Sequence, residues 1–255
     1  MQMKAKNIRS DSKNSTIDNE EIERFSRIAD EWWNVKGKFA PLHSMNPVRI
    51  EYIRDTIIKH TQHSTLNTPP LKDISLLDIG CGGGLIAEPM ARLGAKVTAI
   101  DASEKNIAVA SLHAEKMGLD IDYRCTTAED LAATGEKFDV VLSLEIVEHV
   151  ADINLFIKSA CELLKPNGII ILSTLNRTAK SYALAIIGAE YIMRMLPVGT
   201  HTWSKFLRPS ELCNIIEKNN IEITELMGMV MNPLSWKWHL DAKDLAVNYL
   251  VVGKK

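Results

Sequence analysis

A glycine-rich loop near residue 80 is the first feature of the sequence that predicts chemistry. Asp78 precedes three glycines at alternate positions, Gly80, Gly82 and Gly84. Glycines let the backbone turn sharply and approach a ligand closely, and NAD, FAD and S-adenosylmethionine all bind to such loops. The carboxylate of Asp78 would repel a pyrophosphate, whereas it would attract the ammonium and sulfonium groups of S-adenosylmethionine. The loop therefore favours S-adenosylmethionine, with a nicotinamide cofactor and a purely structural turn as the alternatives.

Acidic residues also follow the next two expected strands. Asp101 closes the second strand, where a carboxylate accepts hydrogen bonds from both hydroxyls of a bound ribose; its alternative role is to cap the next helix. Glu129 or Asp130, after the third strand, is placed to accept a hydrogen bond from an adenine amino group, unless this segment is a solvated turn. The cofactor-binding candidates from this pattern are Asp78, Gly80, Gly82, Asp101 and Glu129.

Alternating apolar runs and helical segments must hold these residues in place. The runs consist of leucine and β-branched residues without clean alternation, which is typical of strands buried on both faces of a parallel sheet. The expected strands are 75–80, 96–101, 121–126, 138–144, 168–175, 221–230 and 246–252. The expected helices are 84–93, 104–117, 152–164 and one that begins at Pro209. Seven strands with helices on both sides predict a doubly wound, mostly parallel α/β fold.

The sequence predicts a polar, disordered tail at 1–17, a helical extension with a linker at 18–70, and the α/β domain at 71–255. Asp18 is expected to cap a first helix, with Glu21 three residues later. Asn46 and Pro47 form a cap followed by a first-turn proline, so a second helix is expected to begin there. An apolar insert follows the fifth strand at about 178–203.

The composition excludes several classes of protein. A chain of 255 residues with 46% hydrophobic residues is too apolar to be disordered throughout. Its formal net charge of −2 argues against a nucleic-acid partner. Four scattered cysteines form no CxxC pair, which favours a reducing compartment, and no apolar run reaches the ~20 residues that a membrane span requires. We expect a soluble, cytoplasmic protein.

Longer motifs carry a resemblance to a known family. DIGCGGG, VTAIDAS, FDVVLSLEIVEHV and LKPNGIIILSTLNR resemble the motifs of class I S-adenosylmethionine-dependent methyltransferases. More narrowly, RIADEWW, PLHSMNPVRIEYI, STLNRTAKSY, GAEYIMRMLPVGTH and VNYL resemble the polyprenyl-phenol O-methyltransferases of ubiquinone biosynthesis, from about residue 20 to 252. The resemblance implies methylation of ring hydroxyls at two steps, on 2-polyprenyl-6-hydroxyphenol and 3-demethylubiquinol. Its cofactor contacts fall on Arg49, Gly80, Asp101 and Leu144.

Two of these positions gain a specific role from the resemblance. Arg49 lies on the second helix of the extension, where its cation pairs with the methionine carboxylate of the cofactor; the alternative is an exposed arginine on a helix face. Leu144 stands where bacterial relatives often have methionine, and either side chain packs on an adenine. The resemblance thus predicts that the extension folds across the cofactor cleft.

The turn after the fourth strand is the candidate catalytic group. Glu145, Glu148 and His149 have the spacing i, i+3 and i+4, so one helical turn would place them on one face. A phenol of pKa ~10 needs roughly 4 kcal/mol to ionise at neutral pH. One interpretation is that His149 removes the phenolic proton as a general base. The other is that the three side chains hold Mg²⁺, which lowers the pKa of the phenol, as the resemblance to mitochondrial members of the family implies. The remaining alternative is a structural cap; His43 and His201 are weaker candidates for the base.

The apolar insert predicts how the acceptor is bound. If the segment is helical, its own apolar residues lie on nearly all of its faces. We therefore expect it to be buried as a cap over the site, in an oligomer interface or in a membrane contact. We expect residues 181–198 to touch the inner face of the cytoplasmic membrane peripherally and to admit the tail of a polyprenylated phenol or quinol. A ubiquinone-biosynthesis complex is a further expected partner. The functional alternatives are another phenolic or carboxylic acceptor and a non-catalytic scaffold that binds the cofactor.

Overall fold

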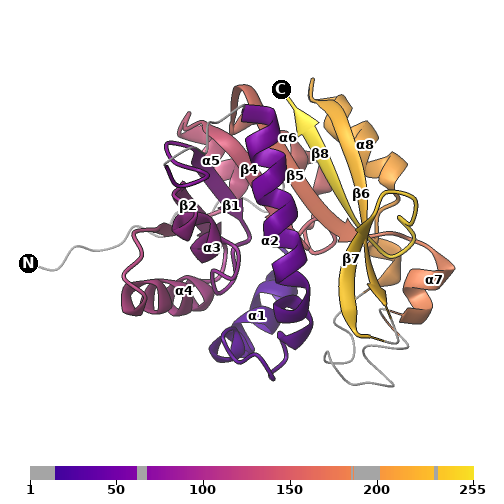
Figure 1. Ribbon diagram of the computed structural model, residues 1–255, viewed down its shortest axis with the longest axis horizontal. Helices are drawn as coiled ribbons and strands as arrows, with labels where there is room; N and C mark the ends of the chain where they lie inside the picture. The colour runs from indigo at the N-terminus through magenta and orange to yellow at the C-terminus, as the bar shows by residue number, and fades with distance from the viewer. Residues whose placement is uncertain (1–14, 62–67, 185, 187–201, 233–234) are drawn as a thin grey trace, which may run out of the picture.

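The computed structural model describes residues 15–61, 68–184, 186, 202–232 and 235–255 (Figure 1). The strands are β1 Ser75–Ile79, β2 Lys96–Asp101, β3 Asp122–Cys125, β4 Phe138–Leu144, β5 Leu164–Leu175, β6 Glu222–Asn232, β7 Lys237–Asp241 and β8 Asn248–Lys254. The α-helices are α1 Asn19–Arg27, α2 Ala40–Thr61, α3 Ala87–Arg92, α4 Glu104–Lys116, α5 Ala128–Ala133, α6 Ile153–Glu162, α7 Ala179–Ser181 and α8 Pro209–Glu217. Two 3₁₀ turns are η1 Ala29–Glu31 and η3 Trp203–Lys205.

One sheet organises the described part of the chain, with the strand order β3-β2-β1-β4-β5-β8-β6-β7. The first five strands in this order pair in parallel, whereas β8, β6 and β7 pair antiparallel. The doubly wound, mostly parallel fold is therefore confirmed. The expected number of seven strands is wrong, because β7 adds an eighth. Its sequence, Lys-Trp-His-Leu-Asp, is largely polar and half-exposed, so it lacks the apolar run of a central strand.

Helices on both faces bury the sheet in two apolar cores. Adjacent strand residues point to opposite faces, so Leu76 packs in one core and Leu77 in the other. Ile53 and Ile57 of α2 enter the first core, and Phe156 of α6 enters the second. This two-sided burial explains why the parallel strands carry continuous apolar runs. An additional helix, α5, follows β3 where no helix was expected.

The first helix of the extension begins where it was predicted, whereas the second begins earlier than predicted. The Asp18 side chain caps α1 by accepting hydrogen bonds from the amides of Glu20 and Glu21. The second helix, α2, begins at Ala40 rather than at Asn46, and Pro47 lies inside it. A proline removes one helical hydrogen bond. Packing of the preceding turn offsets that loss, because Phe39 stacks on Trp32 at 3.6 Å and the His43 ring contacts the Trp32 carbonyl.

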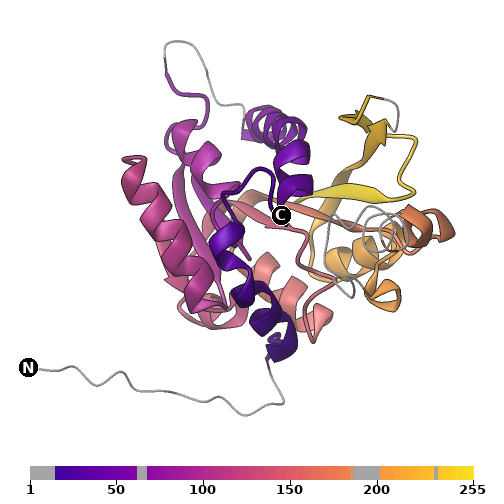
Figure 2. The ribbon, with the colours of Figure 1, turned by 90° about the horizontal axis from the view of Figure 1, so that it is seen from below.

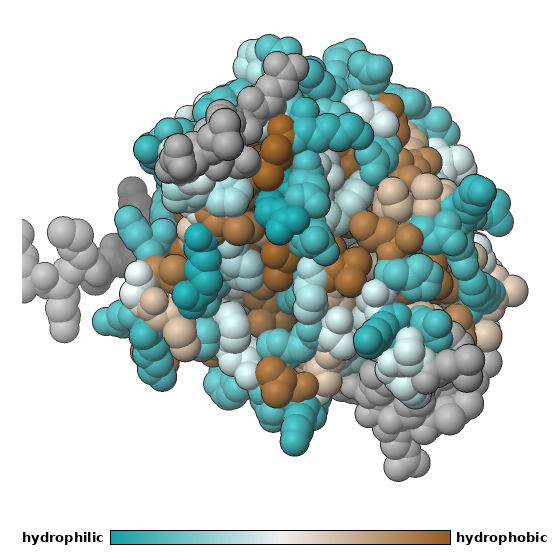
Figure 3. Space-filling model, viewed as in Figure 1, coloured by the Kyte–Doolittle hydropathy of each residue, from teal (hydrophilic) through white to brown (hydrophobic). Residues whose placement is uncertain are grey.

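The extension crosses the edge of the sheet where the parallel strands end. Figure 2, seen from below, shows α1 between α4 on one side and α6 on the other, and Figure 1 shows α2 running along one face of the sheet. On the face seen in Figure 1, apolar side chains gather toward the middle and polar ones dominate the rim (Figure 3). In the part of the chain that the structure describes, no helix combines the length and apolarity needed to cross a membrane.

Candidate active site

The carboxyl ends of β1, β2 and β4 open onto a cavity of about 610 Å³, within the range of small-molecule sites. In a doubly wound sheet this edge is where ligands bind. Predicted residues that line the cavity are Gly80, Gly82, Asp101, Leu144, Glu145, Glu148 and His149. The N-terminal extension lines it as well, through Thr16, Asp18, Glu21 and Trp32 among others. The structure thus brings most of the predicted site together.

The glycine loop owes its shape to the extension packed against it. Gly80, Gly82 and Gly84 have φ of 74°, 53° and 86°, a region that favours glycine. A Cβ on Gly82 would lie 2.4 Å from the Trp32 ring, and the Trp33 indole donates a hydrogen bond to the Gly83 carbonyl. The loop therefore needs glycines for its contact with the extension as well as for a ligand.

Asp101 braces the glycine loop from the end of β2. Its Oδ2 accepts a hydrogen bond from the Gly82 amide at 3.0 Å, and its Oδ1 accepts from the Ser103 amide at 2.8 Å. Burial raises the pKa of Asp101 although these hydrogen bonds oppose the shift. The alternative that Asp101 caps α4 is wrong, because Ser103 is the residue that caps it.

Asp78 and Arg49 are both buried and each affects the pKa of the other, although neither lines the cavity. Arg49 is 3% exposed, so the alternative of an exposed arginine is wrong. One of its nitrogens, Nη2, donates to Asn46, whereas Nε and Nη1 are buried without a hydrogen-bond partner. Burial raises the pKa of Asp78 to about 7, even though the Arg49 charge lowers it, and Asp78 Oδ2 also has no hydrogen-bond partner. Buried polar atoms without partners are typical of a ligand site.

Leu144 and Glu129 differ in their relation to the cavity. Leu144 is 9% exposed and lines it, as predicted. Glu129 does not line it; its Oε1 accepts a hydrogen bond from the amide of Thr16 and its Oε2 accepts one from the hydroxyl of Thr16. Its neighbours Thr127 and Ala128 reach the cavity instead, and the amide of Asp130 donates to the Thr127 hydroxyl.

The turn after β4 is not the expected helical turn. Glu145 has a φ of 58°, a left-handed conformation that ends the strand abruptly, and residues 145–149 form a bend and a turn. Its carboxylate accepts from the Ser173 hydroxyl at 2.8 Å and lies 3.6 Å from Arg49 Nη1. The prediction that Glu145, Glu148 and His149 share one helical face is therefore wrong.

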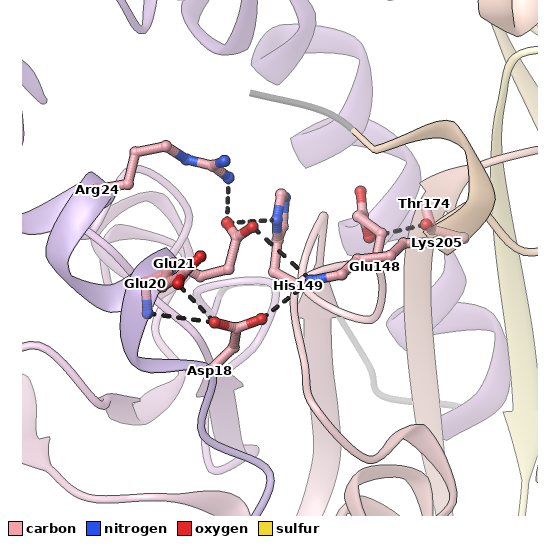
Figure 4. A network of polar contacts seen from close by, with 8 residues as sticks. All are labelled: Asp18, Glu20, Glu21, Arg24, Glu148, His149, Thr174 and Lys205. Atoms are coloured by element: carbon pink, nitrogen blue, oxygen red, sulfur yellow. Dashed lines mark hydrogen bonds and ion pairs between the residues drawn. The ribbon is translucent and has the colours of Figure 1, made fainter. Parts of the chain in front are cut away.

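Glu148 and His149 have different partners (Figure 4). Glu148 is buried, accepts a hydrogen bond from the Thr174 hydroxyl at 2.8 Å, and keeps Oε1 without a partner. Burial raises the pKa of Glu148 to about 7, against the opposing charge of His149. His149 Nδ1 lies 3.0 Å from Oε2 of Glu21, and its ring meets Phe25 edge-on. The side chains of one turn thus have partners on β5 and on α1.

The expected Mg²⁺ ligands are consequently not gathered at one point. Among the residues placed by the structure, no group of three or more His, Cys, Asp or Glu side chains is arranged to hold a metal ion. His43 makes its contact with the Trp32 carbonyl and does not line the cavity. His201 lies outside the described residues.

Two contributions to the site were not predicted. Glu21 was expected only as part of a helix start, and its contact with His149 joins residues 128 positions apart. The β6–β7 hairpin supplies Met229, Met231 and Trp238, which line the cavity together with Met45 of α2. No local pattern predicted the hairpin contribution, because β7 itself carries no strand signal.

The apolar insert is described only at its ends. Within the predicted membrane contact at 181–198, residues 181–184 and 186 are described and the others lie outside the described residues. Tyr182 and Leu184 are 45% and 51% exposed, and Leu184 also lines the cavity. Tyr182 meets Trp203 edge-on, with the ring centroids 6.1 Å apart. Exposed apolar side chains therefore stand beside the mouth of the site.

Comparison with known proteins is consistent with this geometry. A model described as a methyltransferase domain matches residues 77–172. The magnesium protoporphyrin IX methyltransferase of Synechocystis PCC 6803, solved with SAH bound, shares the fold with a TM-score of 0.62 and 18% identity, over 89% of this chain and 93% of that one.

Closer relatives extend over nearly the whole chain. The ubiquinone biosynthesis O-methyltransferase of Cereibacter sphaeroides (strain ATCC 17025) is 56% identical over 95% of this chain and 98% of its own length. The protein of the same name from Bartonella quintana (strain Toulouse) is 53% identical over 94% and 97%. The prediction of an O-methyltransferase is confirmed, and the chain belongs to the family of ubiquinone biosynthesis O-methyltransferases.

Proposed function

We propose that the enzyme methylates a ring hydroxyl of polyprenylated phenol and catechol intermediates of ubiquinone synthesis, with His149 as the general base. One observation carries the proposal: a single cavity is lined by the glycine loop with Asp101, by apolar side chains of α2 and the β6–β7 hairpin, and by His149. Such a cavity has room and suitable chemistry for both a charged nucleoside and an apolar acceptor.

The residues at the strand ends fit S-adenosylmethionine. Asp101 is placed for the ribose hydroxyls, Leu144 for the adenine face, and Gly80 and Gly82 for close approach of the ligand. Arg49 retains two nitrogens without hydrogen-bond partners, which suits a carboxylate. When bound, S-adenosylmethionine supplies an electrophilic methyl carbon on a positively charged sulfur.

Glu129 and Asp78 remain candidates for the same ligand in different ways. Contact of Glu129 with the adenine amino group requires that its carboxylate exchange the Thr16 hydroxyl for this donor. Asp78 acts from behind the loop, where its charge favours the cationic end of the ligand. Both roles are tested by calorimetric titration of the amide variants with S-adenosylmethionine.

His149 removes the proton that prevents the acceptor oxygen from attacking. The phenolic oxygen forms the new bond to the methyl carbon, the carbon–sulfur bond breaks with its electron pair left on sulfur, and the phenolic proton moves to His149 Nε2. Ionising a phenol at neutral pH costs roughly 4 kcal/mol, and a positioned base contributes a rate factor of about 10² to 10⁴. The Glu145 carboxylate balances Arg49, and Glu148 supports the turn through Thr174.

The Mg²⁺ alternative for activating the hydroxyl has its own test. Coordination by Glu145, Glu148 and His149 requires the three side chains, which have partners on β5 and α1, to converge on one point. Methyl transfer that survives treatment with EDTA supports the base. Loss of transfer on chelation, restored by added Mg²⁺, would replace the base by coordination.

The apolar side of the cavity suits the isoprenoid tail. Met45, Met229 and Met231 are flexible apolar side chains that adapt to a long hydrocarbon, and Trp238 lines the same side. The exposed Tyr182 and Leu184 belong to the segment for which we propose peripheral contact with the inner face of the cytoplasmic membrane. Association with a ubiquinone-biosynthesis complex at this surface is part of the same proposal.

Two experiments test the acceptor and the membrane contact. Labelled S-adenosylmethionine is offered with a short-tailed polyprenyl catechol or with the same catechol lacking the tail. A kcat/KM at least 10-fold higher for the tailed catechol supports the proposal, whereas transfer only to untailed acids would overturn it. Liposome flotation compares the full chain with a form lacking residues 181–198, and equal binding by both forms rejects the membrane contact.

A further inference from the structure

We propose that Glu21 is a positioning residue that selects which nitrogen of His149 faces the acceptor. The inference rests on the proposed role of His149 as the base. It adds a residue of the N-terminal helix to the machinery of a turn that follows β4, and Figure 4 shows the two side chains facing each other.

The geometry of the contact determines the tautomer. Oε2 of Glu21 lies 3.0 Å from Nδ1 of His149, and both side chains are largely buried, with 13% and 14% exposure. An ionised carboxylate only accepts hydrogen bonds, so Nδ1 must carry the hydrogen. In the neutral ring, Nε2 then holds the lone pair, which is the state that a general base requires.

The Glu21 carboxylate is held in its ionised form. Burial raises the pKa of Glu21, but the hydrogen bond and charge of His149, with the charges of Arg24 and Lys205, lower it below its ordinary value. Arg24 pairs with the same carboxylate from the next turn of α1, and Lys205 Nζ lies 4.0 Å from Oε1. Glu148 precedes His149 on the turn and directs its own hydrogen bond to Thr174.

The ion pair also stabilises the product of proton transfer. When Nε2 takes the phenolic proton, His149 becomes a cation at hydrogen-bonding distance from a carboxylate. The proton remains on the imidazole and is later released to water, since Glu21 serves to orient and stabilise the ring without taking a proton itself. The Phe25 ring, edge-on at 5.3 Å, further restricts rotation of the imidazole.

The segment that carries Glu21 is attached to the sheet edge on both sides. Asp18 pairs with Lys205 at 3.0 Å, and the carbonyl of Thr16 accepts a hydrogen bond from the Ala151 amide at 3.0 Å. Thr16 also donates to Glu129 beyond the glycine loop. These contacts hold α1 in the register that brings Glu21 to His149, so the catalytic turn is complete only with the extension in place.

Steady-state kinetics on Glu21→Ala and Glu21→Gln test the inference, with Glu20→Gln as the matched control because Glu20 precedes it on the same helix and is exposed. Loss of the carboxylate is expected to lower kcat about 10- to 100-fold, with little change in either KM, in the range known for residues that orient a functional imidazole. Glu20→Gln is expected to retain the wild-type kcat. A wild-type kcat in both Glu21 variants would overturn the inference.

A spectroscopic measurement separates positioning from a general structural role. In ¹⁵N-labelled protein, the His149 signals are assigned by their loss in His149→Ala. We expect the Nδ1–H tautomer in the wild type and a mixture with the Nε2–H tautomer in Glu21→Ala. An unchanged tautomer in Glu21→Ala would contradict the inference even if kcat fell, because the loss would then have another cause.

The His149→Ala variant distinguishes failure of this inference from failure of the proposed function. If His149→Ala retains full kcat, the base is wrong and Glu21 has nothing to position. If His149→Ala loses transfer while Glu21→Ala does not, only the inference about Glu21 fails. In the double variant we expect no loss beyond that of His149→Ala, because the two residues act as one unit.

Discussion

The loop after β1 and the turn after β4 end neighbouring parallel strands, yet they are built in opposite ways. The loop is made of backbone: it consists of glycines with positive φ, and Asp101 accepts a hydrogen bond from the amide of Gly82. The turn at 145–149 is made of side chains whose partners come from α1 and β5. A backbone site is encoded by a local run of residues, whereas a side-chain site depends on partners that the fold brings from elsewhere.

Arg49 interacts with both regions, and removing its charge is expected to have the largest effect on stability and cofactor binding. It lies between Glu145 of the turn and Asp78 behind the loop, and it is almost fully buried. Arg49→Gln leaves the buried Asp78 and the partly buried Glu145 without their cation, so we expect the free energy of unfolding to fall by about 3 kcal/mol. Chemical denaturation measures this change.

The same variant reports on the cofactor, and a neighbour on α2 serves as its control. Arg49→Gln is expected to weaken S-adenosylmethionine at least 10-fold in a calorimetric titration. Arg54→Gln removes an arginine that pairs with Glu51 and Asp55 near the surface, so we expect neither the unfolding free energy nor the cofactor affinity to change noticeably. Equal behaviour of the two variants would show that Arg49 does not join the two regions.

The backbone character of the loop is tested by adding a single methyl group. Gly82→Ala places a Cβ in a left-handed conformation and against the Trp32 ring, so we expect a loss of about 2 to 4 kcal/mol in unfolding free energy. Gly118→Ala has a similar positive φ of 65° with no atom near the added Cβ, and we expect about 1 kcal/mol.

A double variant identifies why Gly82→Ala loses stability. Trp32→Ala combined with Gly82→Ala is expected to be less destabilised than the sum of the two single changes, because the clash is relieved. Strict additivity would mean that the packing of the extension does not constrain the loop.

The pH dependence of the unfolding free energy tests the buried carboxyl next to the loop, and the expected change is smaller than for the variants above. Burial raises the pKa of Asp78 to about 7 in the folded chain, above its unfolded value of 3.8, so the folded state binds the proton more tightly. Its contribution to stability is fully present below pH 3.8 and is lost as pH rises through 7. Without cofactor, we expect Asp78→Asn to flatten the decline in stability between pH 5 and 7.

The control for this pH profile is an aspartate in solvent. Asp120→Asn, at an exposed position, is expected to leave the wild-type slope unchanged. A wild-type slope in Asp78→Asn would mean that this carboxyl is not responsible for the decline in stability.

The parallel core was predictable because β1, β2 and β4 are buried on both faces and carry continuous apolar runs. β7 was missed because a half-exposed edge strand needs no such run. Pro47 suggested a helix start, and the stacking of Phe39 on Trp32 outweighed that local preference. Local sequence patterns therefore predicted the strands at the centre of the sheet correctly. They failed where contacts between distant residues determine whether an element forms or where it begins.

The site divides along the same lines. Gly80 and Gly82 were identified from their spacing, and Asp101 from its place at the end of an expected strand. Both signals are local in the sequence. Arg49 gained its role only through the family resemblance, and its burial on the inner face of α2 depends on the packed helix. Glu21 was predicted only as the residue three positions after the Asp18 cap, because nothing near it in sequence indicates His149. The contact exists only after α1 has crossed the sheet edge.

Methyl transfer by His149→Ala, measured beside its cofactor affinity, tests the central claim most directly. The exposed His239 on β7 provides the matched control, His239→Ala. We predict that His149→Ala binds S-adenosylmethionine as the wild type does and transfers its methyl group to a tailed catechol about 10² to 10⁴ times more slowly, while His239→Ala remains fully active. Wild-type transfer by His149→Ala would contradict the account.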